Sequence, residues 1–271
     1  MEILFAIILG IVQGLTEFLP VSSSGHLSIV NQILEFFGKT PYDPDSGEHL
    51  LMTVVLHGAT AFATIYIFRK DISEIFNGLF SGVKKEIDFS IKVILSMIPA
   101  AFVGIFWGEE IETLFDGDLT LVGFMLIITA LLLYLADRAK STKKNITLLG
   151  SIVIGISQAV AILPGISRSG ATISTSVLLG VDKEKSARFS FLMVVPLILG
   201  KMGKDIFSGE FNEFSSAESL PLLFGFISAF IVGAFACKWM IKIVKNSQLK
   251  YFAFYCVIVG ITLITYQYVI A

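Results

Sequence analysis

Six stretches of this chain are apolar over enough residues to cross a lipid bilayer as helices, which takes about 17–25 residues each. They cover Leu51–Phe68, Ser90–Trp107, Leu119–Ala136, Phe189–Ile206, Leu220–Trp239 and Leu249–Val269. Only 15% of the 271 residues are charged, whereas soluble domains carry about 25%. The sequence therefore predicts an all-α polytopic membrane protein, folded as a single integral membrane domain over residues 1–271.

Two more apolar stretches are each broken by a short insert rich in proline, serine and glycine. The first consists of Ile3–Leu19 with His26–Phe37, and the second of Ile146–Leu163 with Gly170–Leu179. The inserts resemble each other, since "GIVQGLTEFLPVSSSGH" from Gly10 aligns with "GISQAVAILPGISRSGA" from Gly155. Weaker matches follow in the same order, "LMTVVL" with "LMVVPL" and "FVGIF" with "IVGAF". These matches predict two related halves, residues 1–140 and 146–271.

Charge predicts that the two halves have opposite orientations in the membrane. Cytoplasmic loops carry an excess of Lys and Arg. In the first half the basic side of the spans is marked by Arg69, Lys70, Lys84 and Lys85, and acidic segments such as "YDPDSGEH" and "GEEIETLFDGD" mark the other side. In the second half, "DKEKSAR" precedes the first span and the acidic "SGEFNEFSSAES" follows it. Equivalent spans then run in opposite directions, which predicts an inverted-topology repeat.

The same argument predicts that the two broken stretches enter the membrane from opposite faces, the first from outside and the second from the cytoplasm. Each is expected to be a re-entrant helical hairpin, in addition to the six transmembrane helices. Their polar tips would meet near the middle of the bilayer, where irregular backbone is tolerated only if protein or a water-filled cavity surrounds it. We therefore expect a functional site where the tips meet.

The second tip, "PGISRSGAT", has the composition of a phosphate-binding loop. Arg168 near the bilayer centre costs at least ~2.5 kcal/mol, so it needs an anionic partner. A helix that starts near Ala171 would point its positive end at the same place. Hydroxyl groups for a phosphate come from Ser167, Ser169 and Thr172. The alternative is a purely structural ion pair between Arg168 and Glu17 that fastens the hairpins together.

The first tip offers groups for metal binding and proton transfer. Gln13 and Glu17 lie four residues apart on one helix face and can place oxygens on a divalent cation, Mg²⁺ or Ca²⁺. His26 can exchange protons near neutral pH; the alternative is a buried histidine with satisfied hydrogen bonds. Three hydroxyls are candidates for a nucleophile, for phosphate ligands or for the cap of the next helix, and they belong to Ser22, Ser23 and Ser24.

Several other residues are expected to be structural. Cys237 and Cys256 lie in apolar stretches and are interpreted as buried hydrophobic side chains rather than a disulfide or metal pair. His49 is expected at the surface and His57 packed within a span. The net charge of −2 excludes nucleic acid or another polyanion as a partner.

Two motifs resemble those of the bacitracin-resistance family of undecaprenyl-diphosphate phosphatases. "QGLTEFLPVSSSGH" is similar to the family's (E/Q)-x-x-x-E motif with its following Ser and His, and "PGISRSGAT" is similar to its P-G-x-S-R-S-x-x-T motif. The resemblance implies hydrolysis of undecaprenyl diphosphate, a polyprenyl lipid, to undecaprenyl phosphate and inorganic phosphate. It also implies a site at the outer face of the bacterial cytoplasmic membrane, a role in recycling the lipid carrier of cell-wall synthesis, and bacitracin resistance.

By position, the resemblance implies that Gln13 and Glu17 form the motif pair, that Ser23 and His26 lie near the chemistry, and that Arg168 clamps the phosphate. Gln13 stands where many relatives have glutamate, which removes one negative charge from the expected metal site. A transporter that flips polyprenyl phosphate and a catalysis-free binder of bacitracin or lipid are the alternative functions. The sequence leaves open whether Ser23 or water attacks, and whether the protein forms a homodimer among the membrane lipids.

Overall fold

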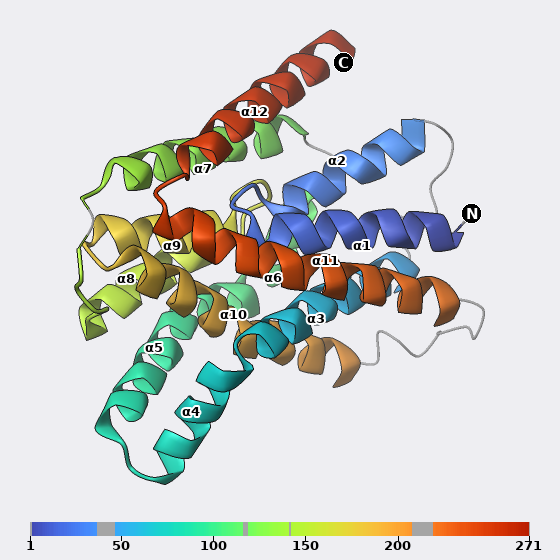
Figure 1. The fold of residues 1–271 in the computed structure, drawn as a ribbon. Helices are drawn as coiled ribbons and strands as arrows, with labels where there is room; N and C mark the ends of the chain where they lie inside the picture. The colour runs from blue at the N-terminus through green and yellow to red at the C-terminus, as the bar shows by residue number, and fades with distance from the viewer. Residues whose placement is uncertain (1, 37–46, 116–118, 141, 208–218, 271) are drawn as a thin grey trace.

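The computed structural model describes residues 2–36, 47–115, 119–140, 142–207 and 219–270, and these residues are almost entirely helical (Figure 1). The helices are α1 (Glu2–Phe18), α2 (Ser23–Phe36), α3 (Gly47–Ile67), α4 (Arg69–Phe80), α5 (Lys84–Phe106), α6 (Gly108–Glu112), the 3₁₀ helix η1 (Thr113–Phe115), α7 (Leu119–Arg138), α8 (Leu148–Val160), α9 (Arg168–Leu178), α10 (Lys183–Phe207), α11 (Ser219–Lys245) and α12 (Lys250–Ile270). The prediction of an all-α membrane protein is confirmed.

Five of the described helices, α5, α7, α10, α11 and α12, are long and apolar enough to cross a membrane. A sixth span results if α3 and α4 are counted together, although the pair is bent by 75° at Phe68. All six predicted apolar stretches are helical where they are described, but α5 and α10 begin earlier than predicted, at Lys84 and Lys183. Most of the added residues are polar. A helix can begin outside the membrane because its backbone hydrogen bonds do not depend on the polarity of the side chains.

The first helix of each hairpin packs against a helix of the other half of the chain. α1 packs along α11 and α3, whereas α8 packs along α5. Both crossings are close: a Cβ atom on Gly10 would lie 2.5 Å from the carbonyl oxygen of Gly225, and one on Gly155 would lie 2.5 Å from that of Ser96. Ser96 and Gly225 lie the same number of residues before the matching "FVGIF" and "IVGAF" segments. Glycine is needed at both crossings because small residues let helix backbones approach closely.

α7 and α12 form a reciprocal contact. A Cβ atom on Gly123 of α7 would lie 2.8 Å from the carbonyl oxygen of Gly260 in α12, and one on Gly260 would lie 2.7 Å from that of Gly123. Each glycine thus lies against the backbone carbonyl oxygen of the other glycine. Such a mutual contact is typical of a two-fold axis, at which one surface faces its own equivalent.

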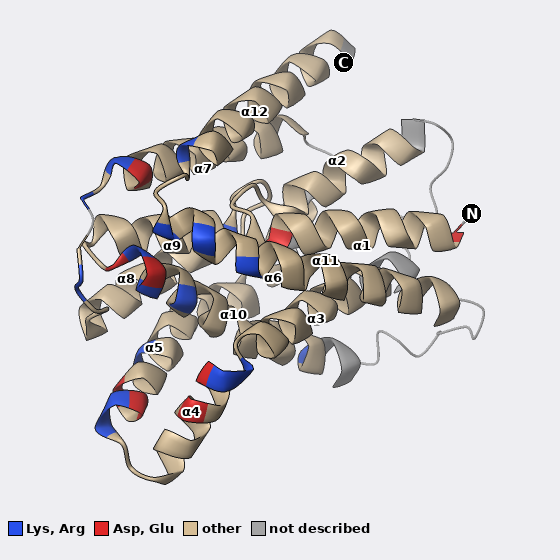
Figure 2. Ribbon diagram, in the orientation of Figure 1, with Lys and Arg blue, Asp and Glu red and all other residues tan. Residues whose placement is uncertain are grey.

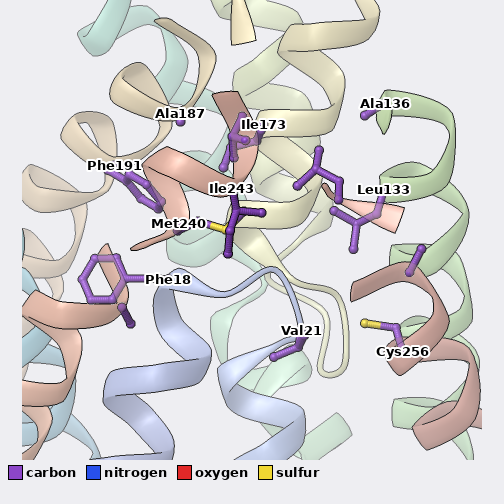
Figure 3. Close-up of a cluster of buried hydrophobic side chains, with 14 of the residues drawn as sticks. Phe18, Val21, Leu133, Ala136, Ile173, Ala187, Phe191, Met240, Ile243 and Cys256 are labelled. Atoms are coloured by element: carbon purple, nitrogen blue, oxygen red, sulfur yellow. The ribbon is translucent and has the colours of Figure 1, made fainter. Parts of the chain in front are cut away.

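The largest cluster of buried side chains surrounds the middle of the molecule, where α1, α7, α9, α10, α11 and α12 contribute to it (Figure 3). Phe18, at the end of α1, packs edge-on against Phe191 of α10, with ring centroids 5.6 Å apart. Cys237 and Cys256 are both free and fully buried, as predicted. This cluster holds the ends of α1 and α9 against the same set of helices.

Basic residues gather on one side of the molecule (Figure 2). Lysine and arginine mark the start of α5, the end of α7, the start of α10 and the junction of α11 with α12. Both chain termini lie on the opposite side (Figure 1). Of the acidic segments that the charge argument assigned to that side, residues 42–49 and 208–219 lie largely outside the described residues, whereas residues 108–115 are described and form α6 and η1.

Candidate active site

Two helical hairpins, α1–α2 and α8–α9, extend from opposite sides of the molecule, and their tips touch at its centre (Figure 1). A Cβ atom on Gly25 of the first tip would lie 3.4 Å from Cα of Gly165 in the second, and one on Gly170 would lie 3.3 Å from Cβ of Pro20. Gly165 has a φ of +90°, and a Cβ there would lie 2.6 Å from the carbonyl oxygen of Val122. Only glycine fits such a backbone at so close an approach.

Both tips end in a helix capped by a serine side chain, although the backbone differs at the capping residue, with φ of +73° at Ser22 and −74° at Ser167. The Ser22 hydroxyl accepts a hydrogen bond from the backbone N–H of Gly25 at 3.2 Å, and the Ser167 hydroxyl accepts one from Gly170 at 3.1 Å. In each cap a second serine hydroxyl, from Ser24 or Ser169, lies 3.3 Å from the first. Serine is favoured here because its side chain satisfies a free N–H of the first helical turn. Capping is thus one role of the tip serines, as the sequence suggested for the first tip.

Glu17 is the centre of the polar contacts between the tips. Its Oε1 atom lies 2.5 Å from Nη2 of Arg168, while its Oε2 accepts hydrogen bonds from Ser23 Oγ at 2.9 Å and from Gln13 Nε2 at 3.1 Å. The Glu17 side chain is 8% exposed and that of Arg168 is 16% exposed. A carboxylate this buried needs a cation and several donors to be stable as an anion. The ion pair between Glu17 and Arg168, which the sequence left as the alternative to a phosphate clamp, is therefore present in the structure.

Arg168 occupies the first position of α9, whereas the sequence suggested that this helix starts near Ala171. Its guanidinium also donates through Nη1 to the backbone carbonyl of Ser190 on α10, at 3.3 Å. The fully buried Thr172 hydroxyl donates to the Arg168 carbonyl at 2.8 Å and lies 2.6 Å from the Ser190 hydroxyl. Phosphate binding by Thr172 stays a prediction: in the structure its hydroxyl bonds to a backbone carbonyl of its own helix and to Ser190.

His26 has partners on both ring nitrogens. Nδ1 lies 2.8 Å from the carbonyl oxygen of Ser22, and Nε2 lies 2.7 Å from the hydroxyl of Tyr255 on α12. Ser23, in contrast, donates to Glu17. In this arrangement the group that can accept the Ser23 proton is the Glu17 carboxylate, because both imidazole nitrogens are already engaged elsewhere.

One amide oxygen of the predicted metal site has no partner. Gln13 is fully buried, and its Oε1 atom accepts no hydrogen bond. An orphaned buried acceptor is costly unless a ligand or water satisfies it. Gln13 Oε1 and the Glu17 carboxylate are oxygen donors of the kind that Mg²⁺ and Ca²⁺ prefer. No group of three or more His, Cys, Asp or Glu side chains with metal-binding geometry occurs among the described residues.

Comparison with known proteins identifies the family. The model of the bacitracin resistance protein BacA matches residues 6–262. An undecaprenyl-diphosphatase of Christiangramia forsetii is 57% identical over 269 residues, which cover 99% of each chain. One of Bacteroides fragilis is 47% identical, over 97% of this chain and 98% of the relative. One of Methanococcus vannielii is 42% identical, over 96% of this chain and 98% of the relative.

The chain belongs to the BacA family. The resemblance on which the sequence interpretation relied is thereby confirmed, and the family match extends over both hairpins and most of α12. The two motifs of this BacA protein therefore form one site, although they lie about half a chain length apart.

Three residues at the site were not predicted. Ser190 and Tyr255 contact Arg168 and His26, as described above. His57 of α3 lies within electrostatic range of Glu17 and donates through Nδ1 to the Thr53 carbonyl, at 2.8 Å. The sequence interpretation treated His57 as a packing residue, but an ionisable side chain within a membrane span is a functional candidate by default. Applying that rule would have found it.

Proposed function

We propose that this chain is an undecaprenyl-diphosphatase, which hydrolyses undecaprenyl diphosphate to undecaprenyl phosphate and inorganic phosphate. The name of its curated relatives supports this activity. The observation that carries the proposal is the shared carboxylate of Glu17, which holds Arg168 on one oxygen and the Ser23 hydroxyl on the other. A phosphate-binding cation, a base and a hydroxyl nucleophile are then in one place. The product returns the lipid carrier to cell-wall synthesis, and its recycling confers bacitracin resistance.

In the resting site Arg168 and Glu17 neutralise each other. The diphosphate takes over the guanidinium, whose planar fork matches two phosphate oxygens, with further donors from the tip serines Ser22, Ser24, Ser167 and Ser169. Ser23 Oγ then attacks the terminal phosphorus as its proton passes to Glu17 Oε2. The bond from that phosphorus to the bridging oxygen breaks, and its electron pair leaves with undecaprenyl phosphate. Water hydrolyses the phosphoserine, which restores the Ser23 hydroxyl and releases phosphate, and Glu17 returns its proton to solvent.

A divalent cation, Mg²⁺ or Ca²⁺, is the cofactor in this proposal. Gln13 Oε1 and the Glu17 carboxylate would hold it, and the orphaned Gln13 oxygen supports that assignment. When bound, such a cation neutralises charge on the phosphates. The amide in place of a second carboxylate lowers the charge of the site, so we expect weaker binding than in relatives with glutamate. Activity should stop when a chelator removes the cation and return when Mg²⁺ or Ca²⁺ is added back.

Membrane placement is also part of the proposal: an inverted-topology repeat in the cytoplasmic membrane, with two re-entrant hairpins and a site open to the outer face. The helix pairs formed between the halves, the recurring serine caps and the reciprocal Gly123–Gly260 contact support the repeat. The gathering of basic residues on one side supports the orientation. In this arrangement the polyprenyl tail of the substrate lies among the membrane lipids, and no nucleic acid takes part.

Single cysteines labelled from either side of the membrane test the placement. Lys143 and Lys245 should be labelled only from the cytoplasm, and Tyr268, which is 78% exposed near the end of α12, only from outside. The outer positions Asp45, Asp116 and Glu213 are expected to agree, although they lie outside the described residues. The natural Cys237 and Cys256 are fully buried and can stay. Labelling of Lys143 and Tyr268 from the same side would contradict the repeat.

Phosphate release by the purified protein tests the activity. Undecaprenyl diphosphate should yield inorganic phosphate with the natural chain and almost none with Glu17→Gln. A flippase for polyprenyl phosphate would move lipid between leaflets of a vesicle and release no phosphate. Transport without hydrolysis would therefore replace the proposed activity by its alternative.

A further inference from the structure

The α12 helix contacts the first tip through two adjacent residues. The Tyr255 hydroxyl lies 2.7 Å from Nε2 of His26, and the Cys256 thiol lies 3.7 Å from the carbonyl oxygen of Pro20. The Tyr255 ring also stacks on the imidazole, with centroids 5.6 Å apart and planes inclined by 14°. These contacts join residues 229 and 236 positions apart in the sequence. They place an aromatic side chain of the second half on the histidine of the first.

Hydrogen-bond chemistry assigns the tautomer of His26. A backbone carbonyl can only accept, so the 2.8 Å contact to Ser22 requires a proton on Nδ1. In the neutral ring Nε2 then carries a lone pair, and the Tyr255 hydroxyl donates to it. The assignment follows from the chemistry of the partners at the two nitrogens. Both nitrogens are thus fixed by partners outside the Glu17–Arg168 pair.

Tyr255 is 43% exposed, although its hydroxyl is engaged. A tyrosine that served only for packing would bury its ring and needs no histidine. Here one face of the ring covers His26 while the rest of the side chain stays open to the surroundings of the protein. Tyr255 therefore stands between the first tip and the exposed surface of α12.

We propose that Tyr255 is a positioning residue of the reaction, which holds His26 as the neutral Nδ1–H tautomer with its ring plane fixed beside the two tips. This inference rests on the proposed role of His26 near the chemistry. Tyr255 does not react itself: it acts through His26, whose ring it holds in one orientation and one tautomer beside the tips. The role is distinct from that of Ser23 and Glu17, which bond to each other and not to His26.

A double-mutant cycle tests the proposal by phosphate release from undecaprenyl diphosphate. Tyr255→Phe keeps the stacked ring and removes the hydroxyl, so we expect kcat to fall about three- to tenfold, the range for one hydrogen bond, with KM nearly unchanged. In a His26→Ala background the same change should have no further effect. Tyr251→Phe is the matched control: Tyr251 lies one turn earlier on α12 and is 62% exposed, so its rate should stay within about twofold.

The double-mutant cycle distinguishes a failure of the role proposed for Tyr255 from a failure of the role proposed for His26. Full activity in Tyr255→Phe, or an equal loss in both backgrounds, would overturn the proposal, because Tyr255 would then not act through His26. Full activity in His26→Ala would instead refute the proposed role of His26 and this inference with it. Neither result bears on Ser23 or Glu17, so the activity itself would stand.

A spectroscopic measurement covers the case in which His26→Ala is too slow to assay. The chain has three histidines, so ¹⁵N-labelled histidine gives few signals and His26 can be assigned with one variant. In the natural protein we expect the Nδ1–H tautomer with a hydrogen-bonded Nε2, and a shifted Nε2 resonance in Tyr255→Phe. An Nε2–H tautomer in the natural protein, or spectra unchanged by Tyr255→Phe, would overturn the assignment.

Discussion

The two hairpin tips share a serine cap and close glycine contacts but carry different chemistry. Serine caps and glycine contacts recur at equivalent positions, so that Ser22 and Ser167 perform the same task. In the alignment of the halves, however, Glu17 lies over Ile162, Ser23 over Arg168 and His26 over Ala171. The first tip thus supplies the acid, the hydroxyl and the imidazole, and the second supplies the cation. Similar glycine crossings support both hairpins, and unlike residues at the aligned positions make their tips complementary.

Removal of Ser23 has the largest expected effect on the rate. It tests whether the first tip alone supplies the nucleophile. If Ser23 attacks, Ser23→Ala should reduce kcat at least ~10⁴-fold, as with other lost nucleophiles. Ser24→Ala is the matched control and should stay within about tenfold, since Ser24 is one of four proposed serine donors to the phosphate and its loss removes a single hydrogen bond. Phosphate release by purified protein measures both. A Ser23→Ala rate within about tenfold of the natural one would assign the attack to water.

Substitution of Glu17 comes next and tests whether one acid is enough. Glu17→Gln keeps the size of the side chain but cannot accept the Ser23 proton, so we expect kcat to fall about 10²–10⁴-fold. Gln13→Ala removes the neighbouring amide and should cost much less, about tenfold, unless saturating cation restores the rate. Equal losses in the two variants would show that the carboxylate is no more important than the amide.

Arg168 tests the second tip. Arg168→Lys keeps the charge but loses the planar fork, and we expect kcat to fall about 10²–10³-fold, as when a preorganised donor to the reacting group is removed. Near-normal turnover in this variant would show that a point charge is sufficient, which would weaken the assignment of a bidentate phosphate clamp.

Thermal stability distinguishes the role of Arg168 in the ion pair with Glu17 from its proposed role in phosphate binding. Arg168→Ala leaves the buried Glu17 without a cation, and breaking a buried pair costs about 3–5 kcal/mol of folding free energy. The double variant Arg168→Ala with Glu17→Ala should regain most of the thermal stability and no activity. If the double variant melts as low as the single one, the ion pair is not what holds the tips together.

The glycine crossings give the smallest effect and test the scaffold. Gly10→Ala and Gly155→Ala each place a methyl group 2.5 Å or less from atoms of the neighbouring helix, so overpacking should cost about 1–3 kcal/mol in each. Gly104→Ala in α5 has no heavy atom within 4 Å of the new Cβ and should be neutral. Thermal denaturation in detergent compares them. A clear loss of thermal stability in Gly10→Ala but none in Gly155→Ala would show that the two crossings are not equivalent.

The sequence predicted the helices and the two tips well, because long apolar stretches and Pro/Ser/Gly inserts have direct physical meanings in a membrane. It did not predict the bend at Phe68, where no proline or glycine marks the break between α3 and α4. Ser190 and Tyr255 were missed for a different reason. They lie in helices that are apolar on most sides, so no periodic pattern shows which residue faces a site built by other elements.

The expectation for His26 shows the same limit. Its place after the tip suggested a group that exchanges protons near the chemistry, but hydrogen-bond partners depend on which helices surround the tip. The pairing of Glu17 with Arg168, in contrast, was predictable from the cost of charge inside a membrane. Composition and spacing thus identify which groups must be paired, and tertiary packing decides the partners of the rest.

The ion pair between Glu17 and Arg168 makes the protein its own competitive ligand. Phosphate has to displace a carboxylate that is tethered at high effective concentration. If the guanidinium is free in about one molecule in a hundred, the apparent dissociation constant is about 100-fold weaker than the intrinsic one. The same competition expels the product, because Glu17 recaptures Arg168 once the phosphate loosens. A tight inhibitor of this site would therefore be zwitterionic, with an anion for Arg168 and a cation that occupies the vacated Glu17.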